Sequence, residues 1–219
     1  MKKFIAYVTV RLNSKRVPLK SIQKIGGKPL INHTIFTLKQ VKEISDILLY
    51  CSQEKIQAYI NPNLSYTFIK RPIKFDSDFA TFNEILDSII DKIETDYIVF
   101  ICCTSPFIKP EAIKEMIYKI ANEGYDSAFT AHSINNFCWY QGKPLNYNPS
   151  NVPRTQDLQP VIAETSGLYI FSKELFKKYK RRIGFKPYIK IVDIFEGWDI
   201  DTINDLKMAK LIHKIIHKK

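Results

Sequence analysis

The chain has 219 residues, of which 45% are hydrophobic and 25% are charged, and this composition is typical of a soluble globular protein with one large core. A formal net charge of +11 indicates an anionic partner: nucleic acid, an acidic membrane surface, or a small molecule with phosphate or carboxylate groups. No run approaches the roughly 18 apolar residues of a membrane span, and the first apolar run lacks a signal-peptide cleavage pattern. We therefore expect one cytoplasmic domain over residues 1–219, with no membrane contact.

Seven apolar runs have the length and composition of buried strands. They cover residues 4–10, 47–51, 66–69, 97–103, 127–131, 167–171 and 188–192. Between or after them, apolar residues recur at helical spacing over 30–41, 82–93, 113–120 and 203–217, the first of these stripes starting behind Pro29. Strands that alternate with helices predict an α/β fold with a mostly parallel sheet and helices on both faces.

The alternation fails between about residues 133 and 163, where Asn, Pro and Tyr crowd a stretch with little periodicity. We expect this stretch to leave the main sheet as a lid or a dimer-forming insertion.

Residues 10–21, "VRLNSKRVPLKS", place an unusually basic loop directly after the first predicted strand. Its cations are Arg11, Lys15, Arg16 and Lys20. In a parallel α/β sheet this turn is a habitual phosphate site, where Arg11 can grip two phosphate oxygens and Asn13 and Ser14 add neutral donors. The alternative is a solvated basic loop. The loop matches neither GxxxxGK[ST] nor GxGxxG, and "GGKPL" at 26–30 is more simply a turn before a helix.

A series of short motifs in a fixed order makes the sequence less generic. They are "RLNSKRVPLKS", "GKPLINHTI", "KRP" at 70–72, "TSP" at 104–106, "PRTQ" at 153–156, "SGLYIF" at 166–171 and "DIDTINDL" at 199–206. Together they resemble the acylneuraminate cytidylyltransferase family over nearly the whole chain. The first and last motifs are specific as a pair, whereas "TSP" or "GKPL" alone is weak.

The resemblance implies a Rossmann-like, three-layer αβα nucleotide-diphosphosugar transferase fold, a homodimer and a dependence on Mg²⁺. It also implies a reaction in which the anomeric hydroxyl of an acidic 2-keto sugar attacks the α-phosphorus of CTP, giving a CMP-sugar for surface polysaccharides. By matching position, the nucleotide contacts would be Arg11, Asn13, Ser14, Lys15, Lys20, Arg71 and Thr81. The metal ligands would be Asp199 and Asp201, and the sugar-facing residues Cys102, Thr104, Arg154, Gln156 and Ser166, with Arg154 and Gln156 in a subunit-bridging segment.

The acidic pair also has a direct physical interpretation. Asp199 and Asp201 are two residues apart, so in an extended segment both carboxylates face one side, as a hard cation with oxygen ligands requires. The alternative is an acidic turn that caps the helix starting at Ile203. Nucleotidyl transfer depends mainly on positioning and charge stabilisation, so Lys20 and Arg11 are the leading catalytic candidates, and Asp199 is a hypothetical acceptor for the hydroxyl proton.

Several positions depart from the family pattern on the side that should meet the sugar. Sialic-acid enzymes tend to have Gln where this chain has Cys102, and Asn where it has Ser166. The acceptor is therefore open: a sialic, legionaminic or pseudaminic acid type, or 3-deoxy-manno-octulosonate. A degenerate, non-catalytic family member and a basic nucleic-acid-binding protein remain as further alternatives. His213 and His217 have the spacing of a metal pair, but a solvated helix face explains them more simply.

Overall fold

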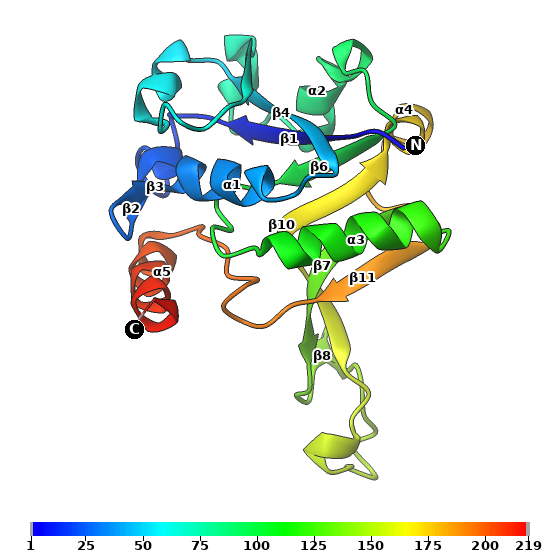
Figure 1. Ribbon diagram of the computed structural model, residues 1–219. Helices are drawn as coiled ribbons and strands as arrows, with labels where there is room; N and C mark the ends of the chain where they lie inside the picture. The colour runs from blue at the N-terminus through cyan, green and yellow to red at the C-terminus, as the bar shows by residue number, and fades with distance from the viewer. Residues whose placement is uncertain (1, 218–219) are drawn as a thin grey trace.

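The computed structural model describes residues 2–217, and its centre is one seven-stranded sheet (Figure 1). The strands are β1 (Phe4–Val10), β4 (Ile44–Cys51), β5 (Thr67–Lys70), β6 (Tyr97–Ile101), β7 (Ser127–Ile134), β10 (Val161–Ser172) and β11 (Pro187–Ile191). Their order is β11-β7-β10-β6-β1-β4-β5, and every pair is parallel except those that β10 makes with β6 and β7. The predicted mostly parallel sheet is confirmed.

Helices cover both faces of this sheet and complete three layers (Figure 1). They are α1 (Leu30–Lys39), α2 (Phe82–Asp87), α3 (Pro110–Asn122), α4 (Lys173–Tyr179) and α5 (Ile203–Ile216). The apolar stripes of α1 and α3 share one buried cluster with one sheet face, and those of α2 and α4 share a second cluster with the other face. No helix among residues 2–217 is both long and apolar enough to span a membrane.

Two helices differ from the sequence predictions. The stripe predicted as one helix over 82–93 is α2 followed by a 3-10 turn, η4 (Ile90–Lys92). At the break, the Ser88 hydroxyl donates to the carbonyl of Ile85 (2.6 Å), a bond that competes with helix continuation. The helix α4 was not predicted; the hydroxyl of Ser172 caps it by accepting from the amide of Leu175 (3.0 Å).

The stretch between β7 and β10 forms an arm that extends away from the body of the molecule (Figure 1). The ends of β7 and β10 pair at its base, with Ile134 opposite Val161. Beyond them lie the short hairpin of β8 (Trp139–Tyr140) and β9 (Lys143–Pro144) and the 3-10 turn η5 (Thr155–Asp157). This is the segment predicted to leave the main sheet.

A third buried cluster holds α5 against the basic loop and the segment that follows it. Leu206 and Ala209 of α5 pack there with Val17, Ile25 and Leu30. Lower on the helix, His213 lies against the small hairpin of β2 (Lys24–Ile25) and β3 (Lys28–Pro29), since a Cβ added at Gly26 would meet its ring at 2.1 Å.

His213 is also part of a cluster of imidazoles, with His33 of α1 and His217 at ring-centroid distances of 6.0 and 4.3 Å. His217 is exposed, as the solvated-face interpretation predicts, but His213 is half-buried and packed. Burial lowers the pKa of both His33 and His213, and the neighbouring charges of Lys28 and His217 act in the same direction.

We expect acid to loosen the contact of α5 with this hairpin. Because the pKa values of His33 and His213 are lowered in the folded chain, the unfolded chain binds protons first, and stability falls as the pH drops below about 6.5. The melting temperature of wild type should therefore fall more steeply between pH 7.5 and pH 5 than that of His213→Gln. Parallel curves for the two proteins would contradict this coupling.

Candidate active site

The basic loop lines a pocket at the carboxyl ends of β1 and β6. The pocket has a volume of about 470 Å³, and its lining includes Thr9, Val10, Arg11, Ser14, Lys15, Arg16, Lys20, Ser21, Asp78, Cys103 and Thr104. Ligands of open α/β sheets gather at this edge. Five of these residues had been chosen from the sequence as site candidates: Arg11, Ser14, Lys15, Lys20 and Thr104.

Lys20 and Asp201 are in direct contact, although they are 181 residues apart. Leu19 adopts a left-handed conformation (φ 54°), costly for a bulky residue, and Lys20, the next residue along the chain, is buried. The Lys20 Nζ donates to the carbonyl of Ile200 (2.7 Å) and lies 3.2 Å from Oδ1 of Asp201. Arg16 reaches the same Oδ1 at 2.8 Å. The basic loop and the acidic pair thus meet at one edge of the sheet.

The start of α5 is capped without help from the acidic pair. Thr202 and Asp205 form a capping box, in which the Thr202 hydroxyl accepts from the Asp205 amide (3.3 Å) and Asp205 accepts from the Thr202 amide (2.7 Å). The alternative that Asp199 and Asp201 serve as helix caps is therefore not supported. Oδ1 of Asp199 instead accepts from the Ser105 hydroxyl at 3.2 Å.

An acidic residue that the sequence analysis missed, Asp78, lies between two of the phosphate-binding candidates. Its carboxylate is 2.9 Å from Arg11 and 2.7 Å from Lys15. Hydrogen bonds from Lys15 and Arg11 lower the pKa of Asp78, so it remains an anion near neutral pH. A triphosphate that binds these two cations must therefore either displace the Asp78 carboxylate or use the N–H donors that Asp78 leaves free.

Arg71 lies behind this pocket rather than on its surface. Its guanidinium is buried, 2.6 Å from Oδ1 of Asp76, and donates to the Thr9 hydroxyl (2.7 Å). Asp76 also accepts from the Ser52 hydroxyl (2.6 Å), so one buried carboxylate organises the loop after β5. Arg71 lines a smaller neighbouring pocket of about 220 Å³, while its Nε is buried without a partner among the described residues.

Two further nucleotide candidates have local partners. The amide of Asn13 donates to the carbonyl of Asp76 (3.1 Å), as does Arg11 (2.8 Å). Thr81 caps α2 through a capping box with Glu84 and lies outside both pockets described above.

The adjacent thiols of Cys102 and Cys103 lie on opposite faces of the sheet. Cys103 belongs to the α1/α3 cluster and lines the 470 Å³ pocket, whereas Cys102, the residue chosen from the sequence, packs on the α2/α4 side. Burial raises the pKa of Cys103 to about 11, so its thiol is not a nucleophile at neutral pH. Thr104 lines the pocket and accepts the amide of Ile200 on its carbonyl (2.9 Å).

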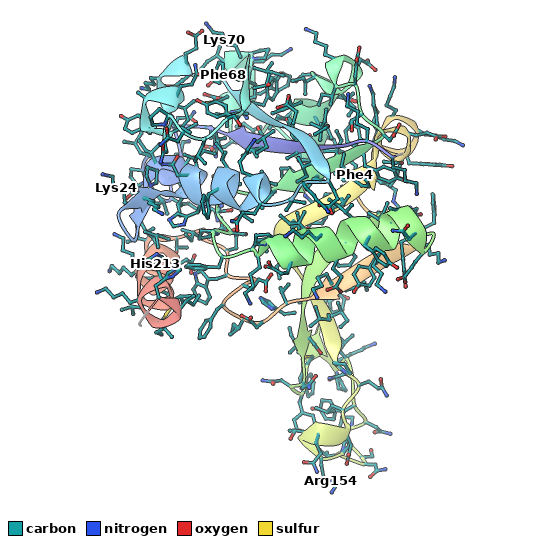
Figure 2. All side chains as sticks on the ribbon, viewed as in Figure 1. Phe4, Lys24, Phe68, Lys70, Arg154 and His213 are labelled. Atoms are coloured by element: carbon teal, nitrogen blue, oxygen red, sulfur yellow. The ribbon has the colours of Figure 1, made fainter. Side chains whose placement is uncertain are left out.

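The remaining sugar-facing candidates lie away from the pocket within one chain. Arg154 is at the far end of the arm (Figure 2), where it pairs with Asp157 at 2.7 Å, and Gln156 is exposed in the same turn. Ser166 is exposed where the pairing of β10 with β7 is interrupted, and its φ is 60°.

Ser166→Asn is expected to stabilise the fold. A left-handed conformation costs an ordinary residue about 1–2 kcal/mol, and Asn tolerates it better than Ser because its side chain hydrogen-bonds locally. A gain of about 1 kcal/mol corresponds to a rise of about 2–4 °C in melting temperature for a chain of this size. Ser133→Asn, at an exposed strand position, is the control, and an unchanged or lower melting temperature for Ser166→Asn would contradict the strain.

Comparison with known proteins places this architecture in a family. A family model described as Cytidylyltransferase matches residues 5–215. N-acylneuraminate cytidylyltransferase A of Danio rerio is 26% identical over 213 residues, which cover 94% of this chain and 49% of that protein. The pseudaminic acid cytidylyltransferase of Campylobacter jejuni is 22% identical over 234 residues, covering 99% and 98%. The chain thus spans about half the length of the Danio rerio relative and almost all of the Campylobacter jejuni one.

Solved structures show the same fold. The structure of CMP:2-keto-3-deoxy-manno-octonic acid synthetase complexed with CTP superimposes with a TM-score of 0.73 at 15% identity, covering 98% of this chain and 99% of that one. A 4-diphosphocytidyl-2C-methyl-D-erythritol synthase from Anaerococcus prevotii gives a TM-score of 0.65 at 14% identity, covering 96% and 97%. The predicted Rossmann-like nucleotidyltransferase fold is therefore confirmed, and the chain belongs to the acylneuraminate cytidylyltransferase family.

Proposed function

We propose that this protein transfers CMP from CTP to the anomeric hydroxyl of an acidic 2-keto sugar and releases pyrophosphate. The observation that carries the proposal is the meeting of the basic loop with Asp201, through Lys20 and Arg16, at the edge of a 470 Å³ pocket. Family membership supports the choice of CTP.

The cations have donors to spare for a triphosphate. Lys20 has three N–H donors and uses two, on Ile200 and Asp201, so one remains for a phosphate oxygen. In the reaction the anomeric oxygen bonds to the α-phosphorus, the bond from that phosphorus to the bridging oxygen breaks, and pyrophosphate leaves with negative charge. Lys20 and Arg11 would stabilise that charge, and Asp199, held by Ser105, is our candidate for accepting the hydroxyl proton.

The acidic pair fits a magnesium ion. Oδ1 of Asp201 is used by Arg16 and Lys20, and Oδ1 of Asp199 by Ser105, but among residues 2–217 no hydrogen bond engages Oδ2 of either carboxylate. Mg²⁺ typically takes one or two carboxylates and completes its shell with water and phosphate oxygens. Bound there, the ion would supply positive charge to the phosphates and hold them in position.

For the acceptor sugar we propose a chemical class and not a single compound. Nonulosonates of the sialic, legionaminic or pseudaminic type are the first choice, because relatives named for sialic and pseudaminic acids cover nearly all of this chain. An enzyme that uses 3-deoxy-manno-octulosonate is the second candidate.

We further propose a homodimer in which the arm contacts a second copy. The arm exposes several large apolar side chains: Phe137, Trp139, Tyr140, Leu145 and Val152. Such a cluster on a projecting segment marks an interaction surface. It also offers a way for Arg154 and Gln156 to reach a pocket, namely that of the partner. Light scattering should give twice the chain mass of 25.6 kDa. A fully active monomer would contradict the proposal that Arg154 and Gln156 act in the pocket of a partner.

Thermal stabilisation by nucleotides tests the function without knowledge of the sugar. A ligand that binds only the folded state raises the melting temperature, by an amount that grows with its affinity. CTP with Mg²⁺ should stabilise the protein more than ATP, GTP or UTP, and acidic sugars should then release pyrophosphate from CTP. Salt-sensitive binding to random oligonucleotides without a response to CTP would favour nucleic-acid binding instead.

A further inference from the structure

In the described part of the chain, one half-buried arginine is held by aromatic rings and not by a carboxylate or a carbonyl. Arg182, in the loop between α4 and β11, lies over the ring of Tyr169, with its Cζ 4.0 Å from the ring centroid and 5.5 Å from that of Phe82. Within residues 2–217 no hydrogen bond or ion pair engages its guanidinium, so its five N–H donors are free for solvent or for a ligand.

The two preceding cations show that this is not a property of the whole loop. Lys180 pairs with Asp87 at 2.5 Å, and Arg181 donates to the carbonyl of Gly184 (3.2 Å) while packing on Phe185. Arg182 alone of the three is held by aromatic rings with its donors uncommitted. Aromatic stacking of this kind orients a guanidinium and leaves its edge available for a planar anion.

Arg182 lines a pocket of about 440 Å³ between α2 and the α4–β11 loop. The other lining residues are Thr81, Phe82, Asn83, Lys180, Arg181 and Ile183. Thr81 directly follows Ala80, which lines the 220 Å³ pocket behind Arg71, and that pocket shares Thr9, Arg11 and Asp78 with the triphosphate pocket. The Arg182 pocket therefore borders the proposed nucleotide site along the chain.

The strands under Arg182 place it on the acceptor side of that site. Tyr169 of β10 pairs with Phe100 of β6, and β6 leads directly into Cys102, one of the sugar-facing candidates. Burial raises the pKa of the Cys102 thiol, the charge of Asp199 raises it further, and the charge of Arg182 opposes both. The charges of Arg182 and Asp199 are thus both felt at Cys102, just beyond the end of β6.

The carboxylate that contacts the same tyrosine, Glu164, does not pair with Arg182. Glu164 accepts the Tyr169 hydroxyl at 2.7 Å, but no ion pair joins it to Arg182 in the described part of the chain. The uncommitted guanidinium edge favours a ligand that brings its own carboxylate.

Building on the proposed function, we propose that Arg182 is a specificity-determining residue that binds the carboxylate of the acidic acceptor. A guanidinium binds a carboxylate through two parallel N–H···O bonds, which a neutral sugar cannot form. The residue would thereby select 2-keto acids over neutral sugars that present the same hydroxyl groups.

Equilibrium binding tests this role separately from catalysis. The probes are N-acetylneuraminate, pseudaminate and 3-deoxy-manno-octulosonate, each also as its methyl ester, titrated calorimetrically into protein saturated with CDP. Arg182→Gln should weaken binding of the best acid by about 10- to 100-fold and leave its ester and CDP unaffected, because only the charge-assisted bonds are lost. Arg182→Lys should fall between the two. Lys178→Gln, which removes an exposed cation of α4 outside this pocket, should bind as wild type does.

The outcomes separate the two proposals. Unchanged acid binding by Arg182→Gln, an equal loss for acid and ester, a loss of CDP binding, or no binding of any acid to wild type would overturn the role of Arg182. Acid binding that depends on Arg182 without CMP transfer from CTP would leave this role standing and overturn the proposed function. If Arg182→Gln melts well below wild type, Arg182→Lys decides, since it keeps the charge but not the two-pronged geometry.

Discussion

Lys20→Ala is expected to lower kcat by about 100- to 1,000-fold, the range seen when one charge-stabilising donor is removed from an active site. The Lys20 ammonium is buried, faces the pocket and retains one free donor. Because the lost interaction strengthens as charge develops on the leaving pyrophosphate, kcat should fall more than the KM for CTP rises.

The same substitution also has a structural cost that must be measured. It leaves the carbonyl of Ile200 without its donor, at an expected cost of about 1–3 kcal/mol in unfolding free energy. Asp201 keeps its pair with Arg16, so the start of α5 should remain in place. The assay is steady-state pyrophosphate release, performed below the melting temperature of the variant.

Lys24→Ala is the matched control, since Lys24 is an exposed cation in β2, four residues along the chain. It changes the net charge equally and should leave kcat within about twofold of wild type, because surface charges far from the reacting atoms contribute little. Equal kinetics for Lys20→Ala and wild type would remove Lys20 from the catalytic machinery.

The centre of the sheet was predictable because β1, β6 and the second half of β4 are buried on both faces and therefore appear as short, nearly continuous apolar runs. The position of β10 was not. It runs antiparallel between β6 and β7, and no local pattern in 161–172 distinguishes it from a parallel strand. Similarly, α4 has only seven residues, too few for a clear helical period in sequence.

The residues of the candidate site also divide into those that the sequence could predict and those that it could not. The location of the basic loop follows from a general rule about strand ends, so its residues could be chosen from sequence. Asp78 and Arg182 could not, because their significance depends on which distant groups they meet or fail to meet. Arg182 belongs to a Lys-Arg-Arg run, a pattern typical of a solvated loop. Only its contact with the ring of Tyr169, 13 residues earlier, distinguishes it from the two preceding cations.

Asp201→Asn is expected to abolish the response to magnesium while preserving the binding of CTP itself. Asn keeps the shape of the side chain and an oxygen acceptor for Arg16 and Lys20, but it removes the negative charge that a divalent ion requires. The capping box of Thr202 and Asp205 is untouched, so α5 should fold normally.

Two electrostatic effects of this change have opposite signs, which makes the test sharp. Asp201 partly neutralises Arg16 and Lys20, so in chelator Asp201→Asn should be stabilised by CTP at least as much as wild type is. The additional stabilisation that wild type gains from CTP on adding Mg²⁺ should disappear in the variant. Turnover should fall by about 100-fold or more, because the ion would supply several kcal/mol of charge stabilisation.

Asp91→Asn is the control, as it removes one exposed carboxylate from a pair with Lys177 at 2.7 Å outside the pocket. It should keep both the response to Mg²⁺ and the turnover of wild type. If Asp201→Asn still gains stability from Mg²⁺ with CTP, or if wild type turns over fully in excess chelator, Asp201 serves to hold Arg16 and Lys20 in place. Asp201 would then match Asp78, a carboxylate that pairs with two other cations of the basic loop, Arg11 and Lys15.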